Sequence, residues 1–226
     1  MKKLVFLGVL FLGACTGATA PVEEPPVNDS SDPHQNPSEE IEYDMDLPYS
    51  SYFNSSNPLV TMVVAGKGTI EIELFPEVAP NSVNNMIKLI QDGFYDGLIF
   101  HRVIQGFMIQ GGWGDLKGKQ ATCTIAGEFA SNGFENPLLH ERGVISMART
   151  NVRNSATSQF FLMHAKSPWL DGEYAAFGGM VSGFEVLDAI ATTPTGAQDA
   201  PNTEVVIESV TVNLRGYNPA LPVCVN

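Results

Sequence analysis

Cysteine is scarce in this chain: the 226 residues include only Cys15, Cys123 and Cys224. No Cys-x-x-Cys pair and no closely spaced histidines accompany them, so the sequence does not predict a metal site. Cys15 belongs to an N-terminal signal described below, so Cys123 and Cys224 are the two cysteines of the folded part that could pair. In an exported protein these two could form a disulfide or remain two thiols, and the sequence leaves both possibilities open.

A long apolar run is also missing. The N-terminal run from Leu4 to Leu12 is far shorter than the roughly 20 residues of a membrane-spanning helix. It follows two lysines and ends in small residues before Cys15, a pattern similar to the signal and cleavage box of a bacterial lipoprotein. That similarity implies that residues 1–15 are an export signal and that Cys15 becomes the lipid-bearing N-terminus. The mature protein would then be extracytoplasmic and lipid-anchored to the bacterial cell membrane. The alternative is an ordinary secretory signal with an incidental cysteine.

Basic residues are absent from residues 16–57, which contain nine of the 25 acidic residues and six of the 15 prolines. A segment of this composition buries too little apolar surface to offset the entropy lost on ordering. We therefore expect an acidic, proline-rich, disordered tether. Three aromatic residues near its end, Tyr49, Tyr52 and Phe53, leave open whether that part docks on the folded domain.

The whole chain has a formal net charge of −13 and no basic patch, so nucleic acid is not an expected partner. Residues 58–226 suffice for one domain with a sizeable core, which we expect to be monomeric.

Two apolar segments, residues 59–65 and 69–75, flank a glycine-containing turn and predict a β-hairpin. In the second segment apolar residues alternate with Glu71 and Glu73, so we expect both carboxylates on a face exposed to water. A helix is predicted to follow. Its candidate caps are Asn81 and Ser82, and its apolar positions recur at helical spacing: Val83, Met86, Ile87 and Ile90.

Further short strands are predicted over residues 98–104, 107–110, 143–148, 158–163, 175–178 and 204–214, with a second helix near residues 185–191. Many short strands with turn signals and only two helices favour a closed antiparallel barrel over a parallel α/β sheet.

One cation stands among large apolar residues in the stretch from Phe100 to Gly112. Arg102 is accompanied there by the carboxamides Gln105 and Gln110. A guanidinium stays charged and needs partners when it is buried, so Arg102 is a candidate functional residue. The alternative is an arginine that anchors a turn through backbone carbonyls.

Three more segments follow that stretch in order along the chain: Ser146-Met147-Ala148-Arg149, Ser158-Gln159-Phe160-Phe161 and Trp169-Leu170-Asp171-Gly172. Together the four segments closely resemble the cyclophilin family of peptidyl-prolyl cis-trans isomerases, and the resemblance covers about residues 59–214. It implies a mostly β fold, a closed eight-stranded antiparallel barrel capped by two α-helices. It also implies an enzyme that accelerates rotation of X-Pro bonds, whose partners are proline-containing unfolded or flexible polypeptides. Given the signal, its substrates would be exported proteins that it helps to fold.

The resemblance also assigns roles to residues. Arg102 would donate a hydrogen bond to the prolyl nitrogen as the amide twists, while Gln110 would orient Arg102 and bond the substrate backbone. An apolar pocket would hold the proline ring, formed by Phe107, Met108, Phe161 and Leu170. The remaining residues would bind the peptide before the proline or edge the pocket: Ala148, Arg149, Gln159, Trp169 and Tyr174. No cofactor or metal is needed for the rotation of an amide.

Two positions depart from the family's best-known eukaryotic members, which have His where this chain has Tyr174 and Asn where it has Arg149. Tyr174 can still donate one hydrogen bond and pack flat, so activity should survive. Cyclosporin binding is left open, although Trp169, which favours it, is present. The alternative function is a non-catalytic peptide-binding or chaperone module on the same fold, which has no need for a cation at the pocket. We interpret His101 as a hydrogen-bonded structural residue, His140 as a loop or strand-end residue without a visible carboxylate partner, and Asp171 as a turn residue.

Overall fold

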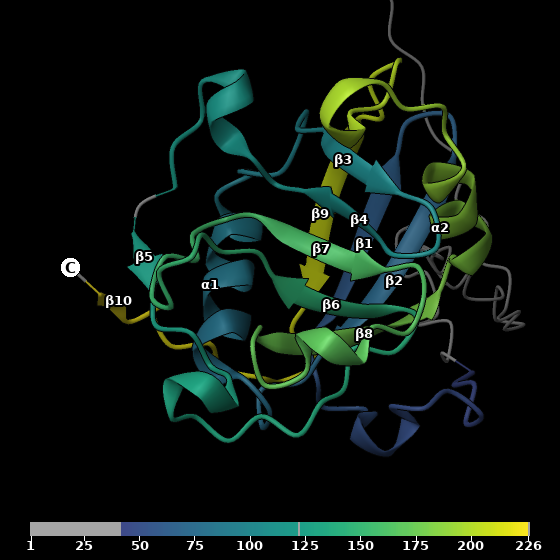
Figure 1. The fold of residues 1–226 in the computed structure, drawn as a ribbon. Coiled ribbons are helices and arrows are strands. Elements are labelled where there is room, and N and C mark those ends of the chain that lie inside the picture. The colour runs from purple at the N-terminus through teal and green to yellow at the C-terminus, as the bar shows by residue number, and fades with distance from the viewer. Residues whose placement is uncertain (1–41, 122, 226) are drawn as a thin grey trace, which may run out of the picture. The chain divides into compact units, whose positions relative to one another are not determined.

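A computed structural model describes residues 42–121 and 123–225 (Figure 1). The predicted signal with Cys15, and residues 16–41 of the predicted tether, lie outside the described residues. The strands are β1 (Leu59–Val64), β2 (Gly68–Leu74), β3 (Phe100–Ile104), β4 (Met108–Gly111), β5 (Thr124–Ile125), β6 (Val144–Met147), β7 (Phe160–Met163), β8 (Ala176–Ser182), β9 (Ile207–Asn213) and β10 (Cys224–Val225). The helices are α1 (Pro80–Gln91) and α2 (Phe184–Ala191), with short 3-10 turns η1 (Ser50–Tyr52), η2 (Gly114–Lys117), η3 (Ala130–Asn132), η4 (Pro168–Leu170) and η5 (Ala197–Asp199).

Eight of the strands form one strongly curved sheet in the order β3-β4-β7-β6-β8-β2-β1-β9, and every ladder in it is antiparallel. The predicted mostly β fold with eight antiparallel strands and two helices is confirmed. The predicted closure is wrong: the ladder is open between β3 and β9, where a single isolated bridge joins Ile99 to Val206. The sheet is therefore an open half-barrel: a few backbone hydrogen bonds flank that bridge, such as Phe100 to Val205 at 3.0 Å, but no ladder pairs β3 with β9.

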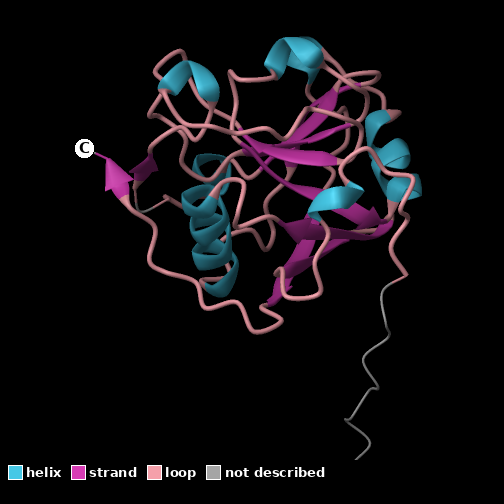
Figure 2. Ribbon diagram, turned by 90° about the horizontal axis from the view of Figure 1, so that it is seen from below, coloured by secondary structure: helices cyan, strands magenta, loops and turns pink. Residues whose placement is uncertain are grey.

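The two α-helices lie at opposite ends of the sheet (Figures 1 and 2). The apolar positions predicted for α1 are all buried. Its predicted caps are wrong, because Asn81 and Ser82 lie inside the first turn and their backbone amides donate to the carboxylate of Glu128, at 2.9 and 2.7 Å. A buried carboxylate at this position satisfies free amides and suits the positive end of the helix dipole. No helix in the described part of the chain is long and apolar enough to cross a membrane.

The compact unit begins at Glu42, before the boundary suggested by composition. Tyr49 is 1% exposed and donates a hydrogen bond to the carbonyl of Met180 at 2.9 Å. Its ring lies over Gly179, where a Cβ atom would stand only 2.3 Å from the tyrosine ring. The aromatic residues whose docking the sequence left open therefore pack on the sheet, and Tyr52 stacks on Phe75 with ring centroids 5.5 Å apart.

The carboxylate of Glu73 fastens this N-terminal segment to β2. It is fully buried, and it accepts hydrogen bonds from the Asn54 amide at 2.7 Å and the Asn57 side chain at 3.0 Å. Tyr43 donates to it as well, and Arg215 forms an ion pair with it at 3.1 Å. The prediction that Glu73 faces water is wrong, because residues 42–57 cover that face of the hairpin.

The C-terminal tail is attached to the loop after η2. Cys123 and Cys224 form a disulfide with their Cα atoms 5.5 Å apart, which settles the alternative left open by the sequence. Next to it β10 pairs with β5, and the Asn81 side chain exchanges hydrogen bonds with the backbone of Val223. The crosslink joins residues 101 positions apart, so it restricts a large part of the unfolded chain.

We expect Glu73→Ala to lower the free energy of unfolding by about 3 kcal/mol, because it leaves buried donors and the Arg215 cation without their partner. The matched control is Glu208→Ala, which removes an exposed carboxylate from β9 and should change stability little. Urea denaturation of both variants measures the difference. Equal stability of the two would contradict the fastening role of Glu73.

Candidate active site

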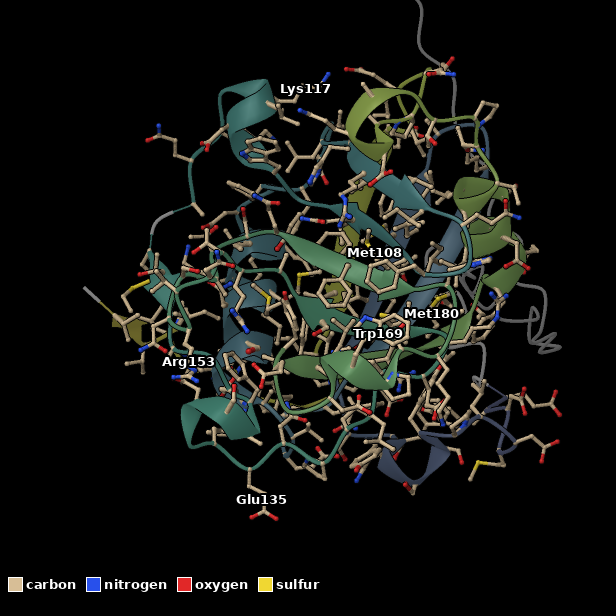
Figure 3. All side chains as sticks on the ribbon, in the orientation of Figure 1. Met108, Lys117, Glu135, Arg153, Trp169 and Met180 are labelled. Carbon is tan, nitrogen blue, oxygen red and sulfur yellow. A yellow bond between two sulfur atoms is a disulfide. The ribbon has the colours of Figure 1, made fainter. Side chains whose placement is uncertain are left out.

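Nine of the eleven predicted site residues line one small cavity of about 140 Å³ on the sheet: Arg102, Phe107, Met108, Gln110, Ala148, Arg149, Phe161, Leu170 and Tyr174. They come from β3, β4, the end of β6, β7 and the η4 region, which the fold brings together from distant parts of the chain. Figure 3 labels two of the eleven predicted residues, Met108 and Trp169. Of the predicted residues, Gln159 and Trp169 do not line this cavity.

The floor of the cavity is set by the pairing of β4 with β7. In this register Gln110 lies opposite Phe161 and Met108 opposite Met163. Because side chains alternate across a strand, Met108 and Gln110 share the cavity face while Ile109 enters the core, where it is fully buried. Met108 and Phe161 are nearly buried as well, at 2% and 5% exposure. The result is an apolar floor with a polar group at its edge.

Arg102 lies on β3 with its side chain 40% exposed. It pairs in register with Gln110, but the side chain of Gln110 donates to Gln159 at 2.9 Å and makes no hydrogen bond to the guanidinium. The Nε atom of Arg102 donates to Asp199 at 3.2 Å, and its other guanidinium nitrogens have no hydrogen-bond partner within the described residues. The structure therefore does not show Gln110 orienting Arg102. The sequence analysis did not identify Asp199, because it lies 97 residues from Arg102 along the chain and belongs to no recognised motif.

The guanidinium of Arg149 is occupied by contacts within the protein. Its guanidinium donates to the carbonyl of Glu173 at 2.8 and 3.0 Å and packs over the ring of Tyr174, 4.5 Å from the centroid. The amide of Ala148 is bonded to the carbonyl of Gln159 at 2.9 Å. The backbone carbonyl of Ala148 and the amide of Arg149 have no partner in the described ranges and remain available to an extended peptide.

Trp169 stands at the rim and not in the wall of the cavity. Trp169 is 65% exposed, and the centroid of its ring lies 5.7 Å from that of the Phe107 ring. The next residue, Leu170, is 8% exposed and reaches the cavity. Tyr174 packs edge-on against Phe161 with centroids 5.8 Å apart, so it forms a side of the pocket.

A buried histidine supports the floor from beneath. His140 is 1% exposed, and its ring nitrogens contact Asp171 and Ser146 at 3.0 Å each. Its ring stacks on Phe161 with centroids 6.0 Å apart. Ser146 is fully buried, so this Ser-His-Asp chain cannot present a nucleophile and instead ties η4 to β6. Asp171, interpreted as a turn residue, thus also supplies the carboxylate partner that the sequence did not reveal.

The surroundings of two histidines near the site favour the neutral form of the imidazole. Burial lowers the pKa of His140, an effect that Asp171 partly offsets. Burial, together with the charge of Arg102, also lowers the pKa of His101, whose ring lies edge-on to Trp113 at 5.3 Å. Within the residues that the structure describes, no group of three His, Cys, Asp or Glu side chains is placed to hold a metal ion.

Comparison with known proteins gives consistent results. A family model described as cyclophilin type peptidyl-prolyl cis-trans isomerase matches residues 59–212. A peptidyl-prolyl cis-trans isomerase of Arabidopsis thaliana is 43% identical, the match covering 65% of this chain and 91% of the relative. Peptidyl-prolyl cis-trans isomerase A of Dickeya dadantii is 40% identical, with 73% and 90% covered.

The solved structures agree with this assignment. The crystal structure of a cyclophilin type peptidyl-prolyl cis-trans isomerase of Cryptosporidium parvum superimposes with a TM-score of 0.63 at 30% identity, covering 70% of this chain and 98% of that one. A structure of the same protein in the presence of the dipeptide Ala-Pro gives a TM-score of 0.62 at 30% identity, covering 69% and 98%.

We expect the free energy of unfolding to decrease as the pH falls below the ordinary histidine pKa of about 6.5. The pKa of His140 is lowered in the folded state, so the unfolded chain binds more protons in this range and acid favours unfolding. Urea denaturation at pH 7.5 and 5.5 should show a smaller loss of stability in His140→Gln than in the wild type. An equal loss in both proteins would show that His140 does not contribute to the dependence.

Proposed function

Because this chain belongs to the cyclophilin family of peptidyl-prolyl cis-trans isomerases, we propose that the cavity beside Arg102 holds the substrate proline while the amide before it rotates. The single observation that supports this location best is the convergence of nine site residues, from five parts of the chain, on one cavity that carries a cation at its edge. The Ala-Pro dipeptide present with the Cryptosporidium relative has the chemistry that such a cavity fits.

The barrier to rotation is about 20 kcal/mol because amide resonance gives the C–N bond partial double-bond character. In the twisted state the lone pair is localised on the prolyl nitrogen, which becomes a hydrogen-bond acceptor. Arg102 then donates to it from a terminal guanidinium nitrogen, since Nε is bonded to Asp199. This hydrogen bond is absent from the planar amide, so it stabilises the transition state more than the ground state and raises the rate.

The remaining residues hold the peptide while one bond turns. The proline ring packs on Met108, Phe161 and Leu170, whose burial leaves little room for water. The chain before the proline lies in an extended form along the free backbone groups of Ala148 and Arg149. The reaction changes a torsion angle and breaks no covalent bond, so these side chains and backbone groups suffice for it.

We further propose that the enzyme acts outside the cytoplasm on exported polypeptides, anchored to the bacterial cell membrane by a lipid on Cys15. The apolar run, the small residues before Cys15 and the acidic segment after it support this location. The disulfide between Cys123 and Cys224 supports an oxidising compartment, because such bonds are rare in reducing cytosol.

We expect Arg102→Ala to lower kcat/KM for an Ala-Pro peptide by about 100-fold, the usual cost of removing a hydrogen bond made in the transition state. Exchange spectroscopy by NMR or a protease-coupled assay measures it, and circular dichroism checks the fold. The control is Arg153→Ala, which removes an exposed arginine that does not line the cavity. Turnover within twofold of the wild type in folded Arg102→Ala would refute the mechanism and favour a peptide-binding module.

We expect Cys15→Ser to release the chain from the membrane fraction of bacteria that express it, because the acyl chain has no attachment site. The matched control, Cys224→Ser, should remain with the membranes since it alters only the disulfide. Incorporation of a labelled fatty acid into the control but not into Cys15→Ser identifies the lipid. Membrane association of the Cys15→Ser chain at the control level would refute the anchor.

A further inference from the structure

We propose that Asp199 is a positioning residue of the isomerase: it fixes the Nε edge of the Arg102 guanidinium and leaves the two terminal nitrogens for the substrate. The inference rests on the proposed role of Arg102 and adds a residue that no motif of the sequence indicates.

The contact itself is specific to one edge of the guanidinium. Nε carries a single N–H, and it donates to Oδ2 of Asp199 at 3.2 Å. A guanidinium held by Nε loses its freedom to rotate about the Cδ–Nε bond, so the plane that contains the other donors becomes fixed. Gln110, to which the resemblance gave the orienting role, is bonded to Gln159 instead. Among the described residues, Asp199 is thus the one whose side chain forms a hydrogen bond with the Arg102 guanidinium.

The backbone around Asp199 is held in an unfavourable conformation. Gln198 and Asp199 have φ angles of 60° and 59°, in the left-handed region that non-glycine residues rarely adopt. The loop is closed beneath them by the amide of Gly196 donating to the Ala200 carbonyl at 2.8 Å, and by the amide of Asn202 donating to the Pro194 carbonyl at 2.9 Å. Strained residues persist where the surrounding structure holds them, and they concentrate at functional sites. Here the strained pair carries the carboxylate to Arg102.

Stability alone does not account for the ion pair. The side chains of Arg102 and Asp199 are 40% and 45% exposed, and ion pairs in such positions add little to folding. An interaction that contributes little to the fold, yet is kept by a strained loop, is more consistent with a role in orienting the cation.

Asp199 also approaches Arg102 from the side that leaves the proline cavity free. Gln198 and Asp199 line a separate cavity of about 570 Å³, together with Trp113 and Pro201. This larger cavity shares Arg102 and Gln110 with the smaller one, whereas Asp199 does not line the smaller one. The carboxylate therefore restrains the guanidinium without occupying the space where the ring would sit.

Two substitutions separate the carboxylate from the loop that carries it. Glycine and asparagine both tolerate the left-handed region, so Asp199→Gly and Asp199→Asn preserve the backbone. Asp199→Asn keeps an oxygen acceptor for Nε, and Asp199→Gly removes it. The control is Glu204→Ala, which lines the same larger cavity but pairs with Lys117 at 2.8 Å and not with Arg102.

The experiment measures kcat and KM of the full chain for an Ala-Pro peptide by NMR exchange, together with the Nε–H resonance of Arg102. In Asp199→Gly we expect kcat to fall about tenfold with KM within twofold, because a misoriented donor weakens the transition state more than substrate binding. Its Nε–H signal should lose its protection from solvent exchange. Asp199→Asn should keep kcat within about threefold and retain the signal, and Glu204→Ala should match the wild type.

The alternatives give different results. If the carboxylate chiefly weakened the charge of Arg102, both Asp199 variants would be faster than the wild type, which would overturn the proposal. Unchanged kcat in Asp199→Gly, or an equal fall in Asp199→Gly and Glu204→Ala, would overturn it as well. If Arg102→Ala is inactive while Asp199→Gly is normal, only the positioning role fails. If Arg102→Ala is itself normal, the proposed mechanism fails.

Discussion

The register between β4 and β7 is the constraint on which the site depends. It places Gln110 opposite Phe161, and it directs Met108 to the cavity face while Ile109 enters the core. A shift by one residue would exchange the two faces, placing the cavity residues in the core and the core residues in water. The burial of Ile109 and Leu162 therefore fixes the fold and the floor of the cavity through the same pairing. Stability and site geometry are not separable on these two strands.

Buried polar groups then attach the surrounding segments to this sheet. Glu73 holds the N-terminal segment, Glu128 holds the first turn of α1, and His140 joins η4 to β6. Each of these groups makes several hydrogen bonds, as a buried polar group must if it is not to destabilise the fold. Because such bonds are directional, they fix the positions of loops that apolar packing alone would hold loosely. The wall formed by Leu170 and Tyr174 depends on the link through His140 in this way.

Local patterns in the sequence predicted the features that depend on neighbouring residues: the strands, the helices and the short motifs. Apolar runs and alternation found the strands of the sheet, helical spacing found the buried face of α1, and four ordered segments contain eight of the nine residues that line one cavity. The ninth, Tyr174, follows the last segment by two residues. The errors concern contacts between distant segments. Alternation showed that Glu73 lies opposite the core but not that residues 42–57 cover it, and no local signal links Asp199 to Arg102. The prediction of a closed barrel failed for the same reason, since closure requires a ladder between β3 and β9, which lie about 100 residues apart and pair only around one isolated bridge.

The partial exposure of Arg102 has a role in the proposed reaction. A fully buried guanidinium would require permanent partners, which would compete with the prolyl nitrogen for its donors. A fully solvated one would interact weakly, since water screens charge. At 40% exposure, with Asp199 on one edge, the Arg102 guanidinium is partly hydrated when no peptide is bound. A bound peptide can displace much of that hydrating water. The field at the prolyl nitrogen then strengthens only when the ring fills the apolar cavity, so packing of the substrate and stabilisation of the twisted amide act together.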